Sequence, residues 1–356
     1  MKRPGARGRE KRWVVRAGDG ETVGAIVLRA GEVDAESAIG EGRVFVGRER
    51  AKSAAQRVNV GDEVKIGASD RAVTKAAQTT GAPSWTVLFE RDGLLACDKP
   101  AGIPTVPDHA GAAHSLVALA AESCGRKAGD LFVTSRLDRE VSGVVIFAKT
   151  PEAEAHLRRA RDVGAYVRRY VAIAAISPTT DATLTTLIRS INVDQPSASS
   201  PNGTWDAPIG AGKDPRHRAA GGAGAKPAQT RFAVIARAGD FVLLAVEPQT
   251  GRTHQIRVHA AHAGAPLLGD RDYGGPSRVT LANGSIVALS APTPRIALHA
   301  ARVVVPDPAS DAASGTALVA TAPIPAALAR IWGELGGAPE AWDTALSCVI
   351  EGRSSG

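Results

Sequence analysis

Cysteine is scarce in this chain, with only Cys97, Cys124 and Cys348 among 356 residues. Their spacing fits neither a disulfide framework nor a zinc site. No hydrophobic run approaches the roughly 18 residues that a membrane-spanning helix needs, and the charged N-terminal stretch is not followed by the apolar segment of a secretory signal. We therefore expect a cytoplasmic protein that does not insert into a membrane.

The chain also lacks a convincing motif for a nucleotide or a metal. In GAGKDP, residues 210–215, an aspartate follows the lysine where a P-loop has serine or threonine, and the P-loop spacing is absent. His254, His259 and His262 suggest a metal site, but no nearby carboxylate or cysteine completes a ligand set. We expect no metal and no cofactor.

Positive charge is in excess, because the formal net charge is +7. This favours an anionic partner, and nucleic acid is the default candidate. Residues 1–20 hold a basic segment that we expect to be a flexible tail, either binding phosphate non-specifically or simply solvated. A second basic cluster lies in the body of the chain and is the better candidate for a nucleic-acid backbone contact: Arg158, Arg159, Arg161, Arg168 and Arg169.

The length and the 44% hydrophobic content allow two domains. Short runs bounded by glycine and aspartate predict small strands and turns over residues 21–67, and a segment without clear apolar period places a domain boundary near residue 82. Beyond it we predict a hairpin or two short strands over 87–100, a buried strand over 143–150 and an alternating strand over 166–174. A long excursion is predicted over 195–228, and irregular structure over the last twenty residues.

Two helices have recognisable ends. Thr150 as N-cap, Pro151 in the first helical position and Gly164 as terminator predict a helix over 151–163. Thr253 as N-cap and Gly264 as terminator predict a helix over 254–263. That second helix would hold Arg257 at a fixed place, where its guanidinium could pair with a buried carboxylate.

Asp138 lies between Arg136 and Arg139, just before the buried strand over 143–150. From the spacing alone, a lone carboxylate of this kind is usually part of a surface ion pair or a turn. The local sequence leaves its role open.

Four stretches in a fixed order carry a resemblance: SRLDREVSGVVIFAKT (135–150), VRRYVAIAA (167–175), TGRTHQIRVHAAHAGAPLLGDRDYGG (250–275) and RIALHA (295–300). Together they resemble RluA-type pseudouridine synthases, over roughly residues 85–330. The resemblance implies an α+β pseudouridine synthase fold with a mixed, mainly antiparallel central sheet and flanking helices. It places a catalytic domain over 83–335 and a C-terminal tail over 336–356. Residues 21–82 more weakly resemble a small S4-like RNA-binding module with a linker.

The resemblance implies a monomer that isomerises uridine in ribosomal or transfer RNA. Asp138 would be the catalytic carboxylate, acting on the ribose as a nucleophile or as a base. Arg257 would pair with it and keep it charged at neutral pH, and Tyr170 would stack on the target base and assist the final proton removal.

Four further residues are implied to bind substrate. Arg136 would fill the stack left by the flipped-out nucleotide, Ile256 would pack near the uracil, and Arg252 and His254 would complete the set. The sequence departs from the family pattern at Ser135, usually histidine, and at Val141, usually threonine.

Two other functions compete with this hypothesis. The first is an RNA-binding or ribosome-assembly protein that kept the scaffold without the chemistry. The second is an aspartate-based glycosidase, which would need a second carboxylate facing Asp138. Glu140 is too close to Asp138 along a strand edge to serve in that role.

Overall fold

The computed structural model describes residues 11–16, 22–29, 35, 39, 44–47, 49–66, 85–107, 114–177, 180–189, 201–214, 216–281, 284–288, 296–310 and 316–350. The chain divides into two compact units, Met1–Ala82 and Pro83–Gly356, which are described separately. The predicted linker before residue 85 lies outside the described residues. Among the described residues, none of the helices has the length and apolar content that a membrane span needs.

The N-terminal unit is a small antiparallel sheet with a helix packed on it. Its strands, in the order β1-β4-β2-β3, are β1 (Lys11–Val14), β4 (Glu63–Ile66), β2 (Val44–Val46) and β3 (Glu49–Arg50), and the helix is α1 (Val23–Arg29). Ile26 of α1 and Val64 of β4 belong to one buried cluster. The prediction of short strands here is confirmed.

The expected flexible tail over residues 1–20 is wrong for the part that the structure describes. Lys11–Val14 form strand β1, which pairs with β4. Val15 is buried and Trp13 packs against the same cluster, so apolar burial orders this basic segment. Residues 1–10 and 17–20 lie outside the described residues.

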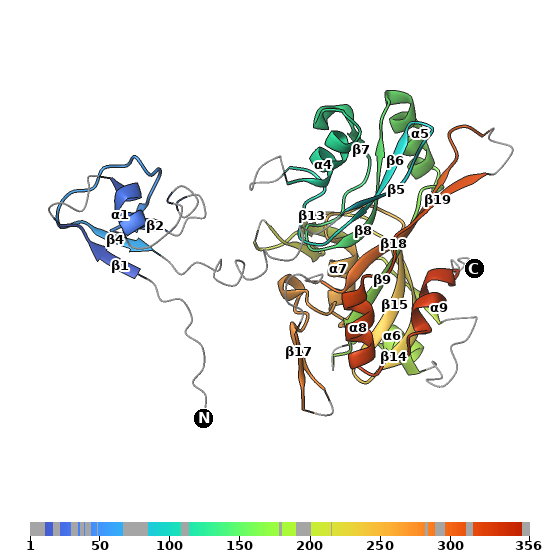
Figure 1. Ribbon diagram of the computed structural model, residues 1–356. Coiled ribbons are helices and arrows are strands. Elements are labelled where there is room, and N and C mark those ends of the chain that lie inside the picture. Colours follow the sequence, from blue (N-terminus) through green and yellow to red (C-terminus); the bar gives the residue numbers. More distant parts are fainter. Residues whose placement is uncertain are drawn as a thin grey trace. The chain divides into compact units, whose positions relative to one another are not determined.

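The second unit is built on a ten-stranded mixed sheet (Figure 1). Its main path runs β10-β14-β15-β9-β18-β8-β6-β5, with β19 pairing β18 and β7 pairing β8. Only the β18–β8 pair is parallel among the pairings described, so the predicted mixed, mainly antiparallel sheet is confirmed. The strands are β5 (Thr86–Arg91), β6 (Leu94–Lys99), β7 (Phe132–Val133), β8 (Ser142–Ala148), β9 (Val167–Ala175), β10 (Asn202–Trp205), β14 (Thr230–Ala238), β15 (Phe241–Pro248), β18 (Leu298–Pro306) and β19 (Ala317–Thr321).

Helices cover both faces of this sheet because its central strands are apolar on both sides. In β9, Tyr170 and Ala172 belong to the cluster on one face, whereas Val171 and Ile173 belong to the cluster on the other, as the predicted alternation requires. The first face packs α4 (Leu116–Ser123), α6 (Ala182–Arg189) and α7 (Gln255–His262). The opposite face packs α5 (Pro151–Asp162), α8 (Ala326–Glu334) and α9 (Ala341–Ser347).

The capping and terminating residues in the sequence located both helices, but one of the two predicted N-caps is wrong. Thr150 Oγ1 accepts a hydrogen bond from the Ala153 backbone N–H, with Pro151 in the first turn of α5 as predicted. In α7 the N-cap is His254 and not Thr253. His254 has a φ of 56°, in the left-handed region that favours glycine, so the chain turns into this helix one residue later than expected.

The prediction of irregular structure over the last twenty residues is wrong for part of this segment. Ala341–Ser347 form α9, and Trp342 and Ala345 are buried in the cluster that also holds Trp332 of α8. Figure 1 shows α8 and α9 in the lower half of the sheet, where α9 lies against β14 and β15. Two tryptophans therefore pack this end of the chain onto the ten-stranded sheet.

The predicted excursion over 195–228 also contains ordered strands. Its strand β10 joins the main sheet beside β14, and a separate three-stranded sheet follows in the order β12-β11-β13. The bounds are β11 (Ile209–Ala211), β12 (Arg218–Ala220) and β13 (Ala223–Lys226). Two further strands pair with each other, β16 (Arg278–Thr280) and β17 (Ile286–Ala288), and two short 3-10 helices are η1 (Ala128–Asp130) and η2 (Arg271–Tyr273).

The parallel β8–β18 pair fixes the strand that follows the Asp138 loop. Gly143 has a φ of 115°, and a Cβ at this position would lie 2.2 Å from the carbonyl oxygen of Ala300. Next to it, Ser142 Oγ lies 2.9 Å from His299 Nδ1, and both side chains are buried. Only glycine permits this approach, so the start of β8 is tied closely to the middle of the sheet.

Candidate active site

One cavity of about 340 Å³ collects every residue that the sequence analysis named for the site. The lining includes Arg136, Asp138, Tyr170, Arg252, His254, Ile256 and Arg257. They come from three separated parts of the chain: the loop before β8, strand β9, and the segment that leads from β15 into α7. The sheet and α7 therefore bring the expected residues together.

The loop that carries Asp138 is clamped on both sides of this residue. The buried Thr105 hydroxyl donates to the Leu137 carbonyl at 2.9 Å and accepts from the Leu137 N–H at 3.0 Å. The Arg139 carbonyl accepts from the Gly102 N–H at 2.8 Å and from Lys99 Nζ at 3.3 Å. Since the Leu137 side chain is also buried, the backbone around Asp138 is fixed, while its side chain stays 30% exposed in the cavity.

Lys99 is a site residue that sequence reasoning missed. Its side chain is fully buried, and its ammonium donates to the carbonyls of Pro100 and Ile103 as well as Arg139. Burial lowers the pKa of Lys99 to about 7, against the opposing charges of Asp138 and Glu140. The sequence feature that could have identified Lys99 is its place between a buried strand and the turn PAGIPT. This turn contacts the Asp138 loop.

Arg257 is the centre of the charged network. Its Nη1 lies 3.2 Å from Asp138 Oδ2, while Nε and Nη2 hold the two oxygens of Asp270 at 2.7 and 2.8 Å. Nη2 also donates to Asp272 at 2.9 Å, and the guanidinium lies over the Tyr273 ring at 4.9 Å. The bidentate pair with Asp270, which is 1% exposed, fixes the guanidinium independently of Asp138.

This network keeps Arg257 charged although it is buried. Burial by itself lowers the pKa of the guanidinium, but the hydrogen bonds and charge of Asp270, together with Asp138 and Asp272, raise it above its ordinary value. A permanent positive charge therefore lies beside the Asp138 carboxylate. Sequence reasoning assigned no role to Asp270, Asp272 and Tyr273. The clustering of two carboxylates and a phenol within GDRDYGG is the sequence feature that could have identified them.

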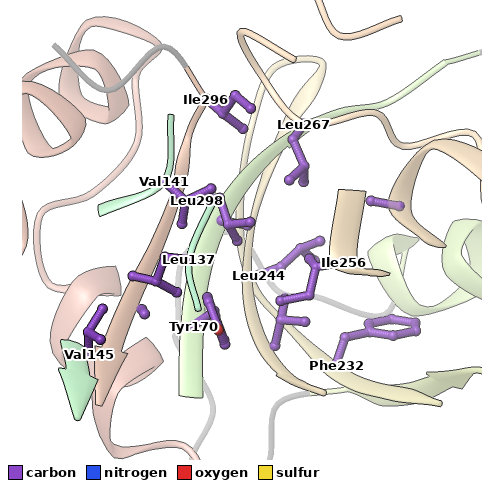
Figure 2. Packing of buried hydrophobic residues seen from close by; sticks show 14 of the residues in the cluster. Leu137, Val141, Val145, Tyr170, Phe232, Leu244, Ile256, Leu267, Ile296 and Leu298 are labelled. Atoms are coloured by element: carbon purple, nitrogen blue, oxygen red, sulfur yellow. The ribbon is translucent and has the colours of Figure 1, made fainter. Parts of the chain in front are cut away.

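Tyr170 forms an apolar wall of the cavity. It is 7% exposed, and Figure 2 shows it among Leu137, Leu298 and Leu244 of the core cluster. Burial raises the pKa of its phenol, so the hydroxyl stays protonated at neutral pH. The ring can offer its face to a flat ligand, and Ile256, which is also buried, adds apolar surface nearby.

Of the three other expected substrate contacts, His254 lines the cavity and two lie at its rim. Arg136 and Arg252 are both exposed, and Arg252 Nε donates to the Pro227 carbonyl at 3.0 Å. The three histidines of the 254–262 stretch have separate surroundings. His259 lies between Thr230 Oγ1 at 2.8 Å and the Ala207 carbonyl at 2.9 Å, and its buried ring is part of the core. His262 is exposed.

The basic cluster of β9 and α5 is split by the fold. Arg161 and Arg168 line the cavity, where Arg168 Nη2 donates to the Thr250 carbonyl at 2.8 Å and Arg161 donates to the Thr134 carbonyl. Arg169 instead faces Glu247 at 3.5 Å, and Arg158 pairs with Glu154 on the surface. Two of the five arginines therefore remain candidates for phosphate contacts at the cavity.

The arrangement brings complementary chemical groups together in one cavity. A rigidly held carboxylate meets a fixed guanidinium, an aromatic wall can receive a base, and arginines at the rim can receive phosphates. Among the described residues, no group of three or more His, Cys, Asp and Glu side chains is placed to hold a metal ion.

Comparisons with known proteins identify the family of this chain. The family model for RNA pseudouridylate synthase matches residues 93–262. Ribosomal large subunit pseudouridine synthase D of Nitrosomonas europaea is 31% identical over 286 residues, covering 79% of this chain and 74% of the relative. The uncharacterized RNA pseudouridine synthase YhcT of Bacillus subtilis is 33% identical over 249 residues, covering 67% of this chain and 68% of the relative.

A solved structure shows the same fold. Human RNA pseudouridylate synthase domain containing 4 matches with a TM-score of 0.51 at 19% identity, covering 75% of this chain and 96% of that chain. At this identity the likeness concerns the fold alone, and it covers most of the catalytic unit.

Proposed function

Because this chain belongs to the RluA family of RNA pseudouridine synthases, we propose that it isomerises uridine in ribosomal RNA, with Asp138 as the carboxylate that acts on the ribose. The enzyme class, an RNA pseudouridine synthase and therefore an isomerase, follows from the family. The name of the Nitrosomonas europaea relative concerns the large ribosomal subunit, and this supports ribosomal RNA over transfer RNA.

The contact between Asp138 and Arg257 is the single observation that carries the residue assignment. The reaction breaks the N1–C1′ bond of uridine, turns the freed uracil and joins C5 to C1′. It needs an ionised carboxylate beside the sugar, acting either as a nucleophile or as a base for a sugar proton. Asp138 fits because its backbone is clamped, its side chain reaches the cavity, and Arg257 lies 3.2 Å from it.

The remaining roles follow from position in the cavity. Tyr170 and Ile256 offer an apolar surface on which a uracil can stack, and Tyr170 would assist the final proton removal from C5, for which its phenol must first give up its own proton. Arg136 is exposed at the rim, where a planar cation can enter the gap left by a flipped nucleotide. Arg252 and the cavity-lining Arg161 and Arg168 are placed for phosphates of the bound strand.

The N-terminal unit would extend the RNA contact as an S4-like module. Its support is a compact fold with a basic strand β1 at its edge. Such a unit adds backbone contacts without entering the reaction.

The substrate is tested with purified protein and RNA labelled with tritium at C5 of uridine, since isomerisation releases this label. Large-subunit ribosomal RNA is expected to release label, and a mixture of transfer RNAs is expected to release none above background. A pseudouridine map of cellular RNA, compared between cells with and without the gene, then locates the site. Loss of signal confined to transfer RNA would contradict the proposed substrate.

A further inference from the structure

His254 has a backbone conformation that needs an explanation. Apart from Asp92 in a hairpin turn, it is the one non-glycine residue with a positive φ among the described residues. This conformation costs free energy, and residues held in it cluster at functional sites. Here it turns the imidazole into the cavity, where the side chain is only 17% exposed.

A chain of hydrogen bonds sets the position of the imidazole proton. The Arg218 backbone N–H can only donate, and it does so to Tyr273 Oη at 2.9 Å. Tyr273 Oη also lies 2.8 Å from His254 Nδ1, which is the one acceptor for its proton in the described part of the chain. We assign the Tyr273 hydroxyl as the donor to Nδ1, its protein acceptor in this position, so that in neutral His254 the remaining hydrogen is on Nε2.

Both rings are neutral at physiological pH. Burial lowers the pKa of His254, with Asp138 opposing and Arg257 reinforcing this effect, and burial raises the pKa of Tyr273. The donating Arg218 belongs to strand β12 of the three-stranded sheet, so this sheet contributes to the site through Tyr273.

The Nε2 atom of His254 lies beside the Asp138 carboxylate. Nε2 lies 3.9 Å from Asp138 Oδ2, which is too far for a direct hydrogen bond, and the Arg257 guanidinium contacts the same oxygen at 3.2 Å. A group bound against Asp138 would therefore lie within reach of a neutral donor whose direction is fixed.

We propose that His254 is a catalytic hydrogen-bond donor, whose Nε2–H binds the uracil carbonyl oxygen beside the sugar and stabilises the negative charge of the departing base. This inference rests on the proposed function, and it assigns to His254 a specific atom of the substrate.

This donor can bind a uracil carbonyl oxygen in both halves of the reaction. When N1–C1′ breaks, the bonding electron pair stays with uracil and spreads over N1, O2 and O4, while Asp138 compensates at the sugar by bonding to C1′ or taking a sugar proton. Turning the ring about its N3–C6 axis exchanges N1 with C5 and O2 with O4. The same N–H can then hold O4 as C5 bonds to C1′ and Asp138 leaves C1′ or returns the sugar proton. The C5 proton is then lost to solvent by way of Tyr170 while N1 takes up a proton from solvent, and His254 keeps its own proton throughout.

The test is single-turnover isomerisation by the full-length protein, with uridine or 2-thiouridine at the target position. His254→Leu is expected to lower the rate about 10- to 100-fold, with RNA affinity unchanged within about threefold, because the donor acts on charge that develops after binding. His254→Gln restores an N–H at a similar reach and is expected to recover at least about fivefold of the loss. The matched control is His262→Leu, on the exposed side of the same helix, at the wild-type rate.

The thio substrate separates a contact from a structural effect. Sulfur is a poor acceptor, so 2-thiouridine is expected to slow the wild type and His262→Leu about tenfold relative to uridine, but His254→Leu by less than about threefold. Tyr273→Phe removes the hydroxyl that fixes the proton, and its isomerisation rate is expected to fall about three- to tenfold. This second variant tests the same contact if His254→Leu does not fold.

The inference is overturned if His254→Leu reacts at the wild-type rate, or if it is slow while glutamine gives no recovery and the thio effect persists. Either result leaves the proposed function standing, provided that the wild type isomerises uridine and Asp138→Asn does not. A wild type that isomerises no uridine would refute the proposed function and this inference together.

Discussion

The guanidinium of Arg257 lies 3.2 Å from the carboxylate of Asp138, although 119 residues separate them in the chain. The same guanidinium makes its two shortest contacts to Asp270, which is buried. Arg257 is therefore fixed by the buried Asp270, whereas its partner Asp138 faces the cavity. This arrangement separates the stability of the network from its use in the reaction.

Removal of Arg257 is expected to damage stability as well as activity. Arg257→Ala leaves the buried Asp270 carboxylate without a partner, which costs on the order of 3–5 kcal/mol in the free energy of unfolding. Urea unfolding of both proteins measures this loss. Arg252→Ala, at an exposed rim position, is the control and is expected to stay within about 0.5 kcal/mol. Equal stability of Arg257→Ala and wild type would contradict the anchoring role of Asp270.

The two aspartates that bind Arg257, Asp270 and Asp272, are expected to differ in their effect on the isomerisation rate. Asp270→Asn places an amide N–H against the guanidinium and loosens it, so the isomerisation rate is expected to fall about 10- to 100-fold. Asp272 is 50% exposed, accepts one hydrogen bond from Arg257 and otherwise lies 3.7 Å from His217, so the rate of Asp272→Asn is expected to fall less than about threefold. Single-turnover rates on the same RNA compare them. A larger loss for Asp272→Asn would reverse the assignment of the anchor.

His299 is expected to make the fold sensitive to mild acid. Burial lowers its pKa from 6.5 to about 4, so between these values the unfolded chain binds a proton that the folded chain does not. Stability therefore falls as the pH drops through this window, by about 2 kcal/mol between about pH 7.5 and pH 5. Urea unfolding at the two pH values measures it.

A variant without this imidazole provides the comparison. His299→Gln does not titrate, so its stability is expected to depend less on pH by about the same 2 kcal/mol. His262→Gln, at an exposed histidine, is expected to keep the wild-type slope. Identical slopes for His299→Gln and wild type would contradict the link to His299.

The N-terminal unit is expected to serve binding more than chemistry. Removal of residues 1–82 takes away a separate compact unit and its basic residues. RNA affinity is then expected to fall, and the slope of its logarithm against the logarithm of salt concentration to become flatter, while the single-turnover rate on saturating RNA changes less than about threefold. Unchanged affinity and slope would remove the proposed RNA-binding role of this unit.

Much of the fold could be predicted because its local signals are strong. Thr150, Pro151 and Gly164 mark the ends of α5, and the alternation around Tyr170 in β9 matches the two buried faces of the sheet. The motifs named residues that share one cavity, because each motif lies where a strand or helix meets the site.

Other features depended on contacts that local pattern does not show. Residues 209–226 are rich in glycine and alanine, yet they form a sheet in which a Cβ on Gly210 would lie 2.3 Å from the Gly222 carbonyl oxygen. Small residues are needed there for close approach, so a packed element has the composition of a loop. The left-handed His254 and its bond to Tyr273 likewise depend on how α7 meets η2.

The most direct test of the central claim is Asp138→Asn, assayed for release of C5 tritium from large-subunit ribosomal RNA and for RNA affinity. The substitution keeps the size of the side chain but removes the charge that we propose to act on the ribose. The account predicts no release above background, with affinity within a few-fold of wild type, because this carboxylate contacts no phosphate. Near-normal turnover by Asp138→Asn would contradict it.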